Sequence, residues 1–335
     1  MKKQKSDNWR LIMKKILPVL VAILLPTSLA AHQAPAVQET LPLDGLMTAF
    51  GWDLSKAKIT TEKVGDNLHV LFGLGGNIAV STGKDGVLIV DDQFPQLIPQ
   101  IMSAIDDINV DVKGDSEVDF AINTHWHFDH AEGNLALGPQ GAWIVAHENS
   151  REMMKQDHII NLVVASYEQK AYPEEAWPNI TYDDDMSFHL NGETVDLYHF
   201  GPAHTTGDTA IVFRGTNAVH LGDVYNNAGY PFIDAGNGGT LDGVIHFCSE
   251  TLKVIDRETT VIPGHGPISD YEGLQDYIEM LTTIRADMIK LINAGASLED
   301  VYNAKVTQQW DEKMGDNTGF INRSYMSLTH KVVDK

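Results

Sequence analysis

Apolar and polar residues alternate in short runs along the first part of the chain, which predicts strands separated by tight turns. Residues 67–92 contain three such runs, divided by the glycines of 73–76 and by the sequence GKDG. The apolar spacing over residues 96–108 instead follows the helical repeat of three and four residues. Two further strands are expected over residues 118–124 and 141–147, and the acidic residue after the second one indicates the first turn of a helix.

A second block of strands follows over residues 186–223, where turn residues again divide four apolar runs. Helices are expected at about 240–256 and from residue 270 onward, with one strand in the sequence TTVIPG between them. Residues 157–185 mix aromatic residues, prolines and acids without either period. We expect an irregular excursion there, over the surface or over a site.

Two blocks of strands, each followed by helices, favour two β-sheets that pack face to face with helices outside, an α+β fold. A parallel sheet in which strands and helices alternate is the alternative, and the hairpin turns of residues 67–92 argue against it. We place a catalytic domain at residues 65–295, after an N-terminal segment over 32–64. A helical extension over 296–335 is expected to pack on the same domain.

Residues 1–31 have the order of a secretory signal peptide, in which basic residues precede an apolar run that ends in small residues. The apolar run is shorter than the roughly 20 residues of a membrane span, and it contains Pro18 and Pro26. We therefore predict export to a bacterial periplasm without a stable membrane anchor. The exported chain would begin near Ala31 or His32. An uncleaved membrane anchor is the alternative.

The charge balance limits the kinds of partner. Residues 1–30 hold six basic residues and one acid, so removal of the leader takes the formal net charge from −22 to −27. A chain this acidic repels phosphate backbones, which argues against a nucleic-acid partner. Hydrophobic residues make up 43% of the sequence, enough for a packed core. The single cysteine, Cys248, excludes an internal disulfide and is expected to be a buried apolar residue.

The sequence NTHWHFDH, residues 123–130, places three histidines and an aspartate directly after a predicted strand. Side chains alternate along an extended segment, so His125, His127 and Asp129 would converge on one side while a turn brings His130 from another. Imidazole and carboxylate ligands suit zinc better than calcium, which takes oxygen ligands. The stretch alone therefore predicts a metal site, although chance histidines in a capped loop remain an alternative.

Three further stretches strengthen the metal hypothesis. His204 lies in GPAHTTGD, Asp223 follows the apolar strand of HLGD, and His265 lies between two glycines in PGHGP. All follow predicted strands, where a rigid sheet can position a site, and the glycines allow the backbone to approach closely. Together the stretches supply five histidines and two aspartates, enough for two metal positions.

With these motifs, the sequence resembles the metallo-beta-lactamase superfamily, whose signature is His-x-His-x-Asp-His with downstream His, Asp and His. The resemblance covers roughly residues 65–290 and implies an αββα four-layer sandwich with two metals, usually zinc, at the edges of the sheets. It implies that the first metal is held by His125, His127 and His204. It implies that the second is held by Asp129, His130 and His265, with Asp223 bridging the two.

Two supporting residues are also expected. The resemblance implies that Asp91, which follows a predicted strand, orients a metal-bound imidazole. His220 lies on the strand that leads to Asp223, so it is a candidate to support the site from behind the ligands.

Two zinc ions that share a hydroxide provide a nucleophile at neutral pH, so the predicted reaction is hydrolysis of an acyl bond in a β-lactam, lactone, ester or thioester. We expect Asp129 to act as the catalytic residue that orients the hydroxide and receives its proton. An aspartate at the Asp223 position resembles the glyoxalase II and lactonase branches, whereas export and His130 fit β-lactamases. A mononuclear-iron oxygenase of the persulfide dioxygenase type, which would use His125, His204 and Asp223, and a metal-binding protein without catalysis are the alternatives.

The choice of substrate rests on charge. Residues 215–252, which contain Asp223 and the loop after it, include no Lys or Arg. β-Lactam substrates carry a carboxylate, and a desolvated ion pair with that group is worth more than an exposed one. We therefore expect a small neutral lactone or ester to be preferred. The oligomeric state is left open.

Overall fold

The computed structural model describes residues 40–108 and 117–329. The chain divides into two units, residues 1–34 and residues 35–335, and all of the described residues belong to the second. The predicted signal peptide, residues 1–31, lies outside the described residues. Among the described residues, no helix is both long and apolar enough to cross a membrane.

The first large sheet has seven strands in the order β10-β7-β6-β5-β4-β3-β2. From β2 to β5 neighbouring strands pair antiparallel, and from β5 through β6 and β7 to β10 they pair parallel. The strands are β2 (Thr60–Lys63), β3 (Leu68–Phe72), β4 (Ile78–Gly83), β5 (Gly86–Val90), β6 (Phe120–Ile122), β7 (Trp143–His147) and β10 (Ile180–Tyr182).

The second large sheet has six strands in chain order, antiparallel except where β14 and β15 run parallel. They are β11 (Asp185–Leu190), β12 (Glu193–Tyr198), β13 (Ala210–Phe213), β14 (Ala218–His220), β15 (Thr260–Ile262) and β16 (Ser269–Asp270). A small third sheet contains β1 (Thr40–Leu41), β9 (Ser166–Gln169) and β8 (His158–Asn161), in that order.

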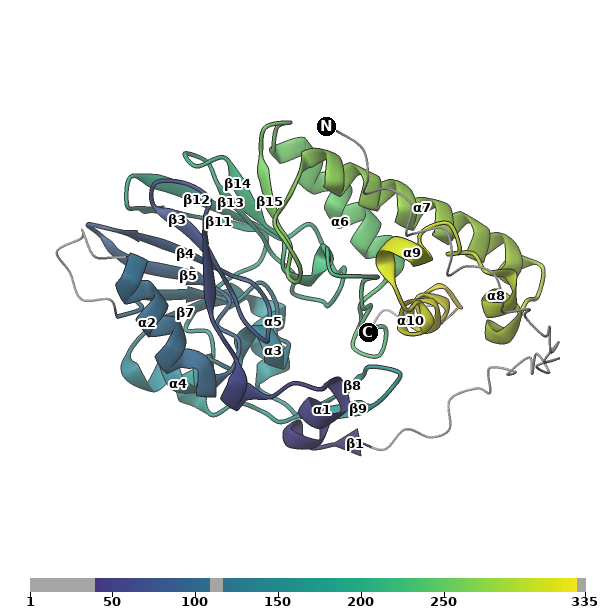
Figure 1. Cartoon of the computed structure of the whole chain (residues 1–335), viewed down its shortest axis with the longest axis horizontal. Coiled ribbons are helices and arrows are strands. Elements are labelled where there is room, and N and C mark those ends of the chain that lie inside the picture. Colours follow the sequence, from purple (N-terminus) through teal and green to yellow (C-terminus); the bar gives the residue numbers. More distant parts are fainter. Residues whose placement is uncertain (1–39, 109–116, 330–335) are drawn as a thin grey trace, which may run out of the picture. The chain divides into compact units, whose positions relative to one another are not determined.

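Helices cover the outer faces of both large sheets (Figure 1). The helices in the first half of the chain are α1 (Leu43–Phe50), α2 (Ile98–Ile108), α3 (Phe128–Ala131), α4 (Asn134–Leu137) and α5 (Glu148–Met154). Those of the second half are α6 (Leu241–Val254), α7 (Tyr271–Asn293), α8 (Leu298–Ala304), α9 (Asp311–Met314) and α10 (Thr318–Thr329). Short 3₁₀ turns are η1 (Leu54–Lys56), η2 (Pro95–Leu97), η3 (Gly138–Gln140), η4 (Glu174–Ala176) and η5 (Gly222–Val224).

The central strands of the two large sheets, such as β5 and β13, are apolar on both faces because they are buried on both sides. In β5, Leu88 and Val90 face the second sheet and pack with Ile211 and Phe213. Ile89, between them, points the other way, into the core under α2. Alternation along the strand thus fills two separate cores. The expected α+β fold with an αββα sandwich is confirmed, and the fully parallel alternative is wrong.

The structure differs from the sequence prediction in two places. Residues 157–185 are ordered as the β8–β9 hairpin, η4 and β10, and not as an irregular excursion. The hairpin turn contains Val163 at φ 68°, a conformation that β-branched residues rarely adopt, so the sequence carries no usual turn signal there. The second place is the start of the catalytic domain, predicted at residue 65. Strand β2 precedes that residue and yet forms an edge strand of the first sheet. Among the helices after residue 296, α10 packs against α6, α7 and α8.

Candidate metal centre

The stretch after β6 presents four of the predicted ligands, and it is buried throughout. His125 lies in the segment between the strand and α3, and His127 is the residue that caps the N-terminus of α3. Asp129 and His130 lie within α3 itself. The extended segment and the short helix therefore aim these side chains in different directions, as the alternation of side chains had suggested.

The other three predicted ligands come from the second sheet. His204 lies in the loop between β12 and β13, Asp223 lies in η5 directly after β14, and His265 follows β15. A β-carbon on Gly264 would collide with the Asp223 carboxylate, and a β-carbon on Gly76 would collide with the His130 ring. The close approach of the loops at the two sheet edges therefore requires glycine at both positions.

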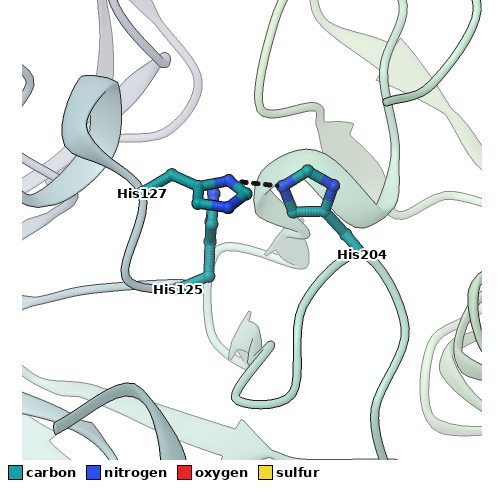
Figure 2. Close-up of side chains that lie close together, drawn as sticks. All are labelled: His125, His127 and His204. Atoms are coloured by element: carbon teal, nitrogen blue, oxygen red, sulfur yellow. Dashed lines mark hydrogen bonds between the residues drawn. The ribbon is translucent and has the colours of Figure 1, made fainter. Parts of the chain in front are cut away.

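His125, His127 and His204, here called the first cluster, lie with their ring nitrogens close enough to share a metal ion. Figure 2 shows His125 and His127 leaving one loop and facing His204, which approaches from another. Nδ1 of His127 lies 2.9 Å from Nε2 of His204. Nε2 of His125 is buried and has no hydrogen-bond partner.

The outer nitrogens of these rings show which inner nitrogens are free. His204 donates from Nδ1 to the carbonyl oxygen of Phe232 at 2.7 Å, so in the neutral ring Nε2 holds a lone pair. His127 faces the carboxylate of Asp234 with Nε2, at 3.0 Å, which leaves the lone pair on Nδ1. Two lone pairs therefore point toward each other, an arrangement that a cation stabilises.

The outer nitrogen of His125 also faces an acceptor. The Thr124 hydroxyl donates to Asp91 at 2.9 Å, so it can accept the proton on Nδ1 of His125 at 3.0 Å. The lone pair of His125 then lies on Nε2, the nitrogen without a partner. An orphaned buried acceptor is costly in an ordinary core, and all three rings of the first cluster fit a bound metal.

Asp129, His130 and His265, here called the second cluster, also lie close enough to hold a metal ion. Nε2 of His265 is 3.2 Å from both Nε2 of His130 and Oδ2 of Asp129. Asp223 lies between the clusters. Its Oδ1 is 3.1 Å from Nε2 of His130, and its Oδ2 is 3.8 Å from Nε2 of His204. The structure thus brings all seven predicted ligands together, with one carboxylate facing both clusters.

The electrostatic environments of the clusters differ. In the first cluster, burial and the neighbouring rings lower the pKa of His125 and of His204. In the second cluster burial acts in the same direction, but the nearby carboxylates dominate. Asp223 and Asp129 raise the pKa of His265 to about 10, and carboxylates likewise raise the pKa of His130 well above its usual value.

Asp91 supports the second cluster directly. Its Oδ2 lies 2.7 Å from Nδ1 of His130, and its Oδ1 accepts a hydrogen bond from the backbone of Thr124 at 2.7 Å. Asp91 has φ 63°, a disfavoured backbone region for a residue with a β-carbon. This backbone geometry aims a fully buried carboxylate at the outer nitrogen of His130, the position expected of a residue that orients a metal-bound ring.

His220 contacts the loops and none of the imidazoles of the two clusters. Its Nε2 donates to the carbonyl oxygen of Asn77 at 2.9 Å, and its Nδ1 accepts from the backbone of Gly222 at 3.1 Å. Asn77 in turn donates from its backbone to Gly264. The buried ring therefore fixes the backbone directly before Asp223 and, through Asn77, the backbone beside His265.

Asp234 is a supporting residue that the sequence did not reveal. It is fully buried and holds the outer nitrogen of His127, and its backbone nitrogen donates to the carbonyl oxygen of His204 at 3.1 Å. It follows no predicted strand and belongs to no recognised motif. Only its contact across the fold shows its role.

Comparisons with known proteins identify similar sequences and similar folds. The sequence profile of the metallo-beta-lactamase superfamily matches residues 73–265. The curated protein Beta-lactamase-like protein 2 homolog from Caenorhabditis elegans is 23% identical over 250 residues, which cover 73% of this chain and 70% of that protein.

Two solved structures show a similar fold. A metallo-beta-lactamase from Pontibacter korlensis superposes with a TM-score of 0.54 at 16% identity, over 67% of this chain and 99% of that one. The DIM-1 metallo-beta-lactamase gives a TM-score of 0.53 at 18% identity, over 68% of this chain and 99% of that one. At such identities these structures establish the fold alone.

Proposed function

The chain belongs to the metallo-beta-lactamase superfamily, and from that premise we propose that it is a zinc-dependent hydrolase of acyl bonds. The observation that carries the proposal is the pair of facing nitrogens on His127 and His204, 2.9 Å apart, with each outer nitrogen occupied by an acceptor. Such a pair, beside the orphaned Nε2 of His125, is prepared for a positive ion.

We propose two zinc ions per chain. His125, His127 and His204 would hold the first, and Asp129, His130 and His265 the second, with Asp223 contributing to both. A set of five imidazoles and two carboxylates suits zinc. Bound zinc lowers the pKa of water to near 7 and polarises a carbonyl group.

The chain's own residues define where a substrate would approach. The side chains of His125, His130 and His204 are fully buried, whereas those of Asp129, Asp223 and His265 are 13%, 14% and 22% exposed. The open face of the centre therefore lies on the carboxylate side. Asp129, held at 3.2 Å from His265, is placed to orient a water molecule and to accept its proton.

The preferred substrate in this proposal is a neutral lactone or ester, and β-lactams would turn over more slowly. Residues 215–252 include no Lys or Arg, and they supply Asp223, Phe232 and Asp234 to the centre. The exported chain, at −27 by sequence, would also slow the approach of anions. Export itself is part of the proposal, and the intact mass of protein from the periplasm, starting near Ala31 or His32, would test it.

The experiment for the proposed function combines metal analysis with a substrate panel. Purified exported chain should contain zinc, and its kcat/KM should be higher for an uncharged lactone or ester than for a carboxylated β-lactam. A β-lactam value above about 10⁵ M⁻¹s⁻¹, within the usual range for adapted enzymes, with slower neutral substrates would contradict the substrate preference. One iron per chain with oxygen-dependent turnover would favour the oxygenase alternative.

A further inference from the structure

A single loop, residues 225–240, supplies outer contacts to three of the ligating histidines. The carbonyl oxygen of Phe232 accepts from His204, and Asp234 holds His127. Near the start of the loop, the backbone of Asn227 donates to the carbonyl oxygen of His265 at 2.9 Å. The position of this loop therefore determines how the rings of His127 and His204 are oriented, and it fixes the backbone at His265.

Helix α10 contacts this loop at Tyr230 and contacts the chain again at Leu241, directly after the loop ends. Phe320 stacks on Tyr230 with ring centroids 5.1 Å apart and an interplanar angle of 7°. Further along, Ser327 accepts a hydrogen bond from the backbone of Leu241 at 3.3 Å. Arg323 lies between the two attachment points on the helix, and Asp234 lies between them on the loop.

Arg323 is a buried cation without an ion pair. Only 6% of the residue is exposed, and its guanidinium donates to the neighbouring Asn322 side chain, from Nε at 3.2 Å and from Nη2 at 2.9 Å. It forms no ion pair with any carboxylate in residues 40–108 or 117–329. A buried charge is unfavourable unless a group of opposite charge compensates it.

Asp234 is the complementary case. Its carboxylate is fully buried, and within the same described ranges its contacts are His127 and the amide of Asn237, with no lysine or arginine in an ion pair. Burial lowers the pKa of Arg323, and the negative charge of Asp234 raises it. The contacts at Phe320 and Ser327 flank Arg323 on the helix, and their partners flank Asp234 in the sequence, so the guanidinium faces the part of the chain that carries this carboxylate.

Two uses of the Arg323 charge are conceivable, and the geometry separates them. An anionic group of a substrate at Arg323 would lie beside the Asp234 carboxylate, which repels it. If Arg323 instead compensates the charge of Asp234, no second anion has to lie beside that carboxylate. We propose that Arg323 is a positioning residue of the metal centre, whose charge stabilises the buried Asp234 carboxylate in the place where it orients His127. The inference rests on the proposed metal-dependent function.

The test measures zinc affinity, since loss of a residue that orients a ligating histidine typically costs 10- to 100-fold in affinity. Full-length chain stripped of metal would be titrated with zinc against a chromogenic chelator. Arg323→Gln should weaken the zinc bound by the first cluster about 10-fold and leave the second zinc within about 3-fold of the parent. Arg323→Lys, which keeps the charge, should recover most of the loss.

A double-mutant cycle tests the route through Asp234. If Arg323 acts through that carboxylate, Asp234→Asn should weaken the first zinc about 10- to 100-fold, and adding Arg323→Gln should weaken it no further. The matched control is Arg285→Gln, which removes an arginine that pairs with Asp242 on the surface and should leave both zinc affinities unchanged. If Arg323→Gln does not fold, Arg323→Met, of similar length without the charge, takes its place in the cycle.

The outcomes are distinguishable from those of the proposed function. A parent chain that binds no zinc would overturn both ideas. A parent that binds zinc, with an Arg323→Gln variant of equal affinity, would overturn only the positioning role. Independent effects that multiply in the double variant, or equal weakening of both zinc sites, would show that Arg323 supports the fold in general and would also overturn it.

Discussion

The two clusters share Asp223 but differ in burial and in charge. The first cluster has three imidazoles, two of them fully buried and the third, His127, 3% exposed. Each outer nitrogen faces an oxygen supplied by the fold. The second cluster adds the Asp129 carboxylate and reaches the surface at His265. In the proposed function, the first cluster would hold an ion, and the second would present one to a substrate.

The largest expected effect comes from removing the residue that joins the clusters. Asp223→Ala should leave about one zinc per chain, because the second cluster loses a carboxylate that lies 3.1 Å from His130. Hydrolysis should fall about 10³-fold or more, since a Lewis-acid metal contributes several kcal/mol to the transition state. Two retained zinc ions with near-parent turnover would show that the clusters do not depend on this bridge.

A second variant separates zinc binding from proton transfer in the second cluster. Asp129→Asn keeps the shape of the side chain and should retain much of the zinc, while kcat falls about 10²-fold or more, as for the loss of a general base. Metal analysis and steady-state kinetics on the same preparation would measure both. If the variant hydrolyses as fast as the parent, Asp129 has no role in proton transfer.

The clusters should also differ in how they respond to pH. Without metal at neutral pH, His265, with a pKa of about 10, and His130, with a raised pKa, hold protons, which an ion entering the second cluster must displace. Its zinc affinity should therefore fall as the pH is lowered below about 10, by up to about 10²-fold per pH unit for two displaced protons.

The first cluster should show a weaker dependence over the same range, because lowered pKa values leave His125 and His204 without protons. Zinc titrations in buffers of different ionisation enthalpy would count the protons released by each ion. Equal proton release from both ions would contradict the assigned difference in charge.

The smallest of these effects concerns the carboxylates behind the rings. Asp91→Asn should weaken the second zinc about 10- to 100-fold, because Asp91 holds His130 directly and reaches His125 only through the Thr124 hydroxyl. Asp234→Asn should have the opposite preference and weaken the first zinc. Chelator competition on the two variants would show the crossed pattern, and identical patterns would remove the distinction between the clusters.

The sequence predicted the fold and the seven candidate ligands because both depend on local patterns. Buried strands such as β5 read as continuous apolar runs, and each ligand lies in a short motif at a strand end. The β8–β9 hairpin was missed for a local reason as well. Its turn uses Val163 at a positive φ instead of glycine, and the backbone nitrogen of Val163 donates a hydrogen bond to the side-chain oxygen of Asn161.

The supporting residues depend on contacts that no local pattern encodes. Asp234 reaches His127 across 107 positions in the sequence, and Arg323 approaches the same loop from the last helix. Residues 215–252 contain no Lys or Arg, and the buried Arg323 comes from α10, far along the chain. Residues that hold a ligand from behind are set by packing between distant elements, and they become visible only in three dimensions.

The central claim is that two zinc ions, held by two unlike clusters, make this chain an acyl hydrolase. The most direct measurement is a zinc titration of metal-free protein in which bound metal and hydrolysis of a neutral lactone or ester are followed together. We expect two zinc ions per chain, the first bound more tightly by the buried imidazoles, with full activity only after the second. Full activity at one zinc per chain, or no hydrolysis of any acyl substrate with two ions bound, would contradict it.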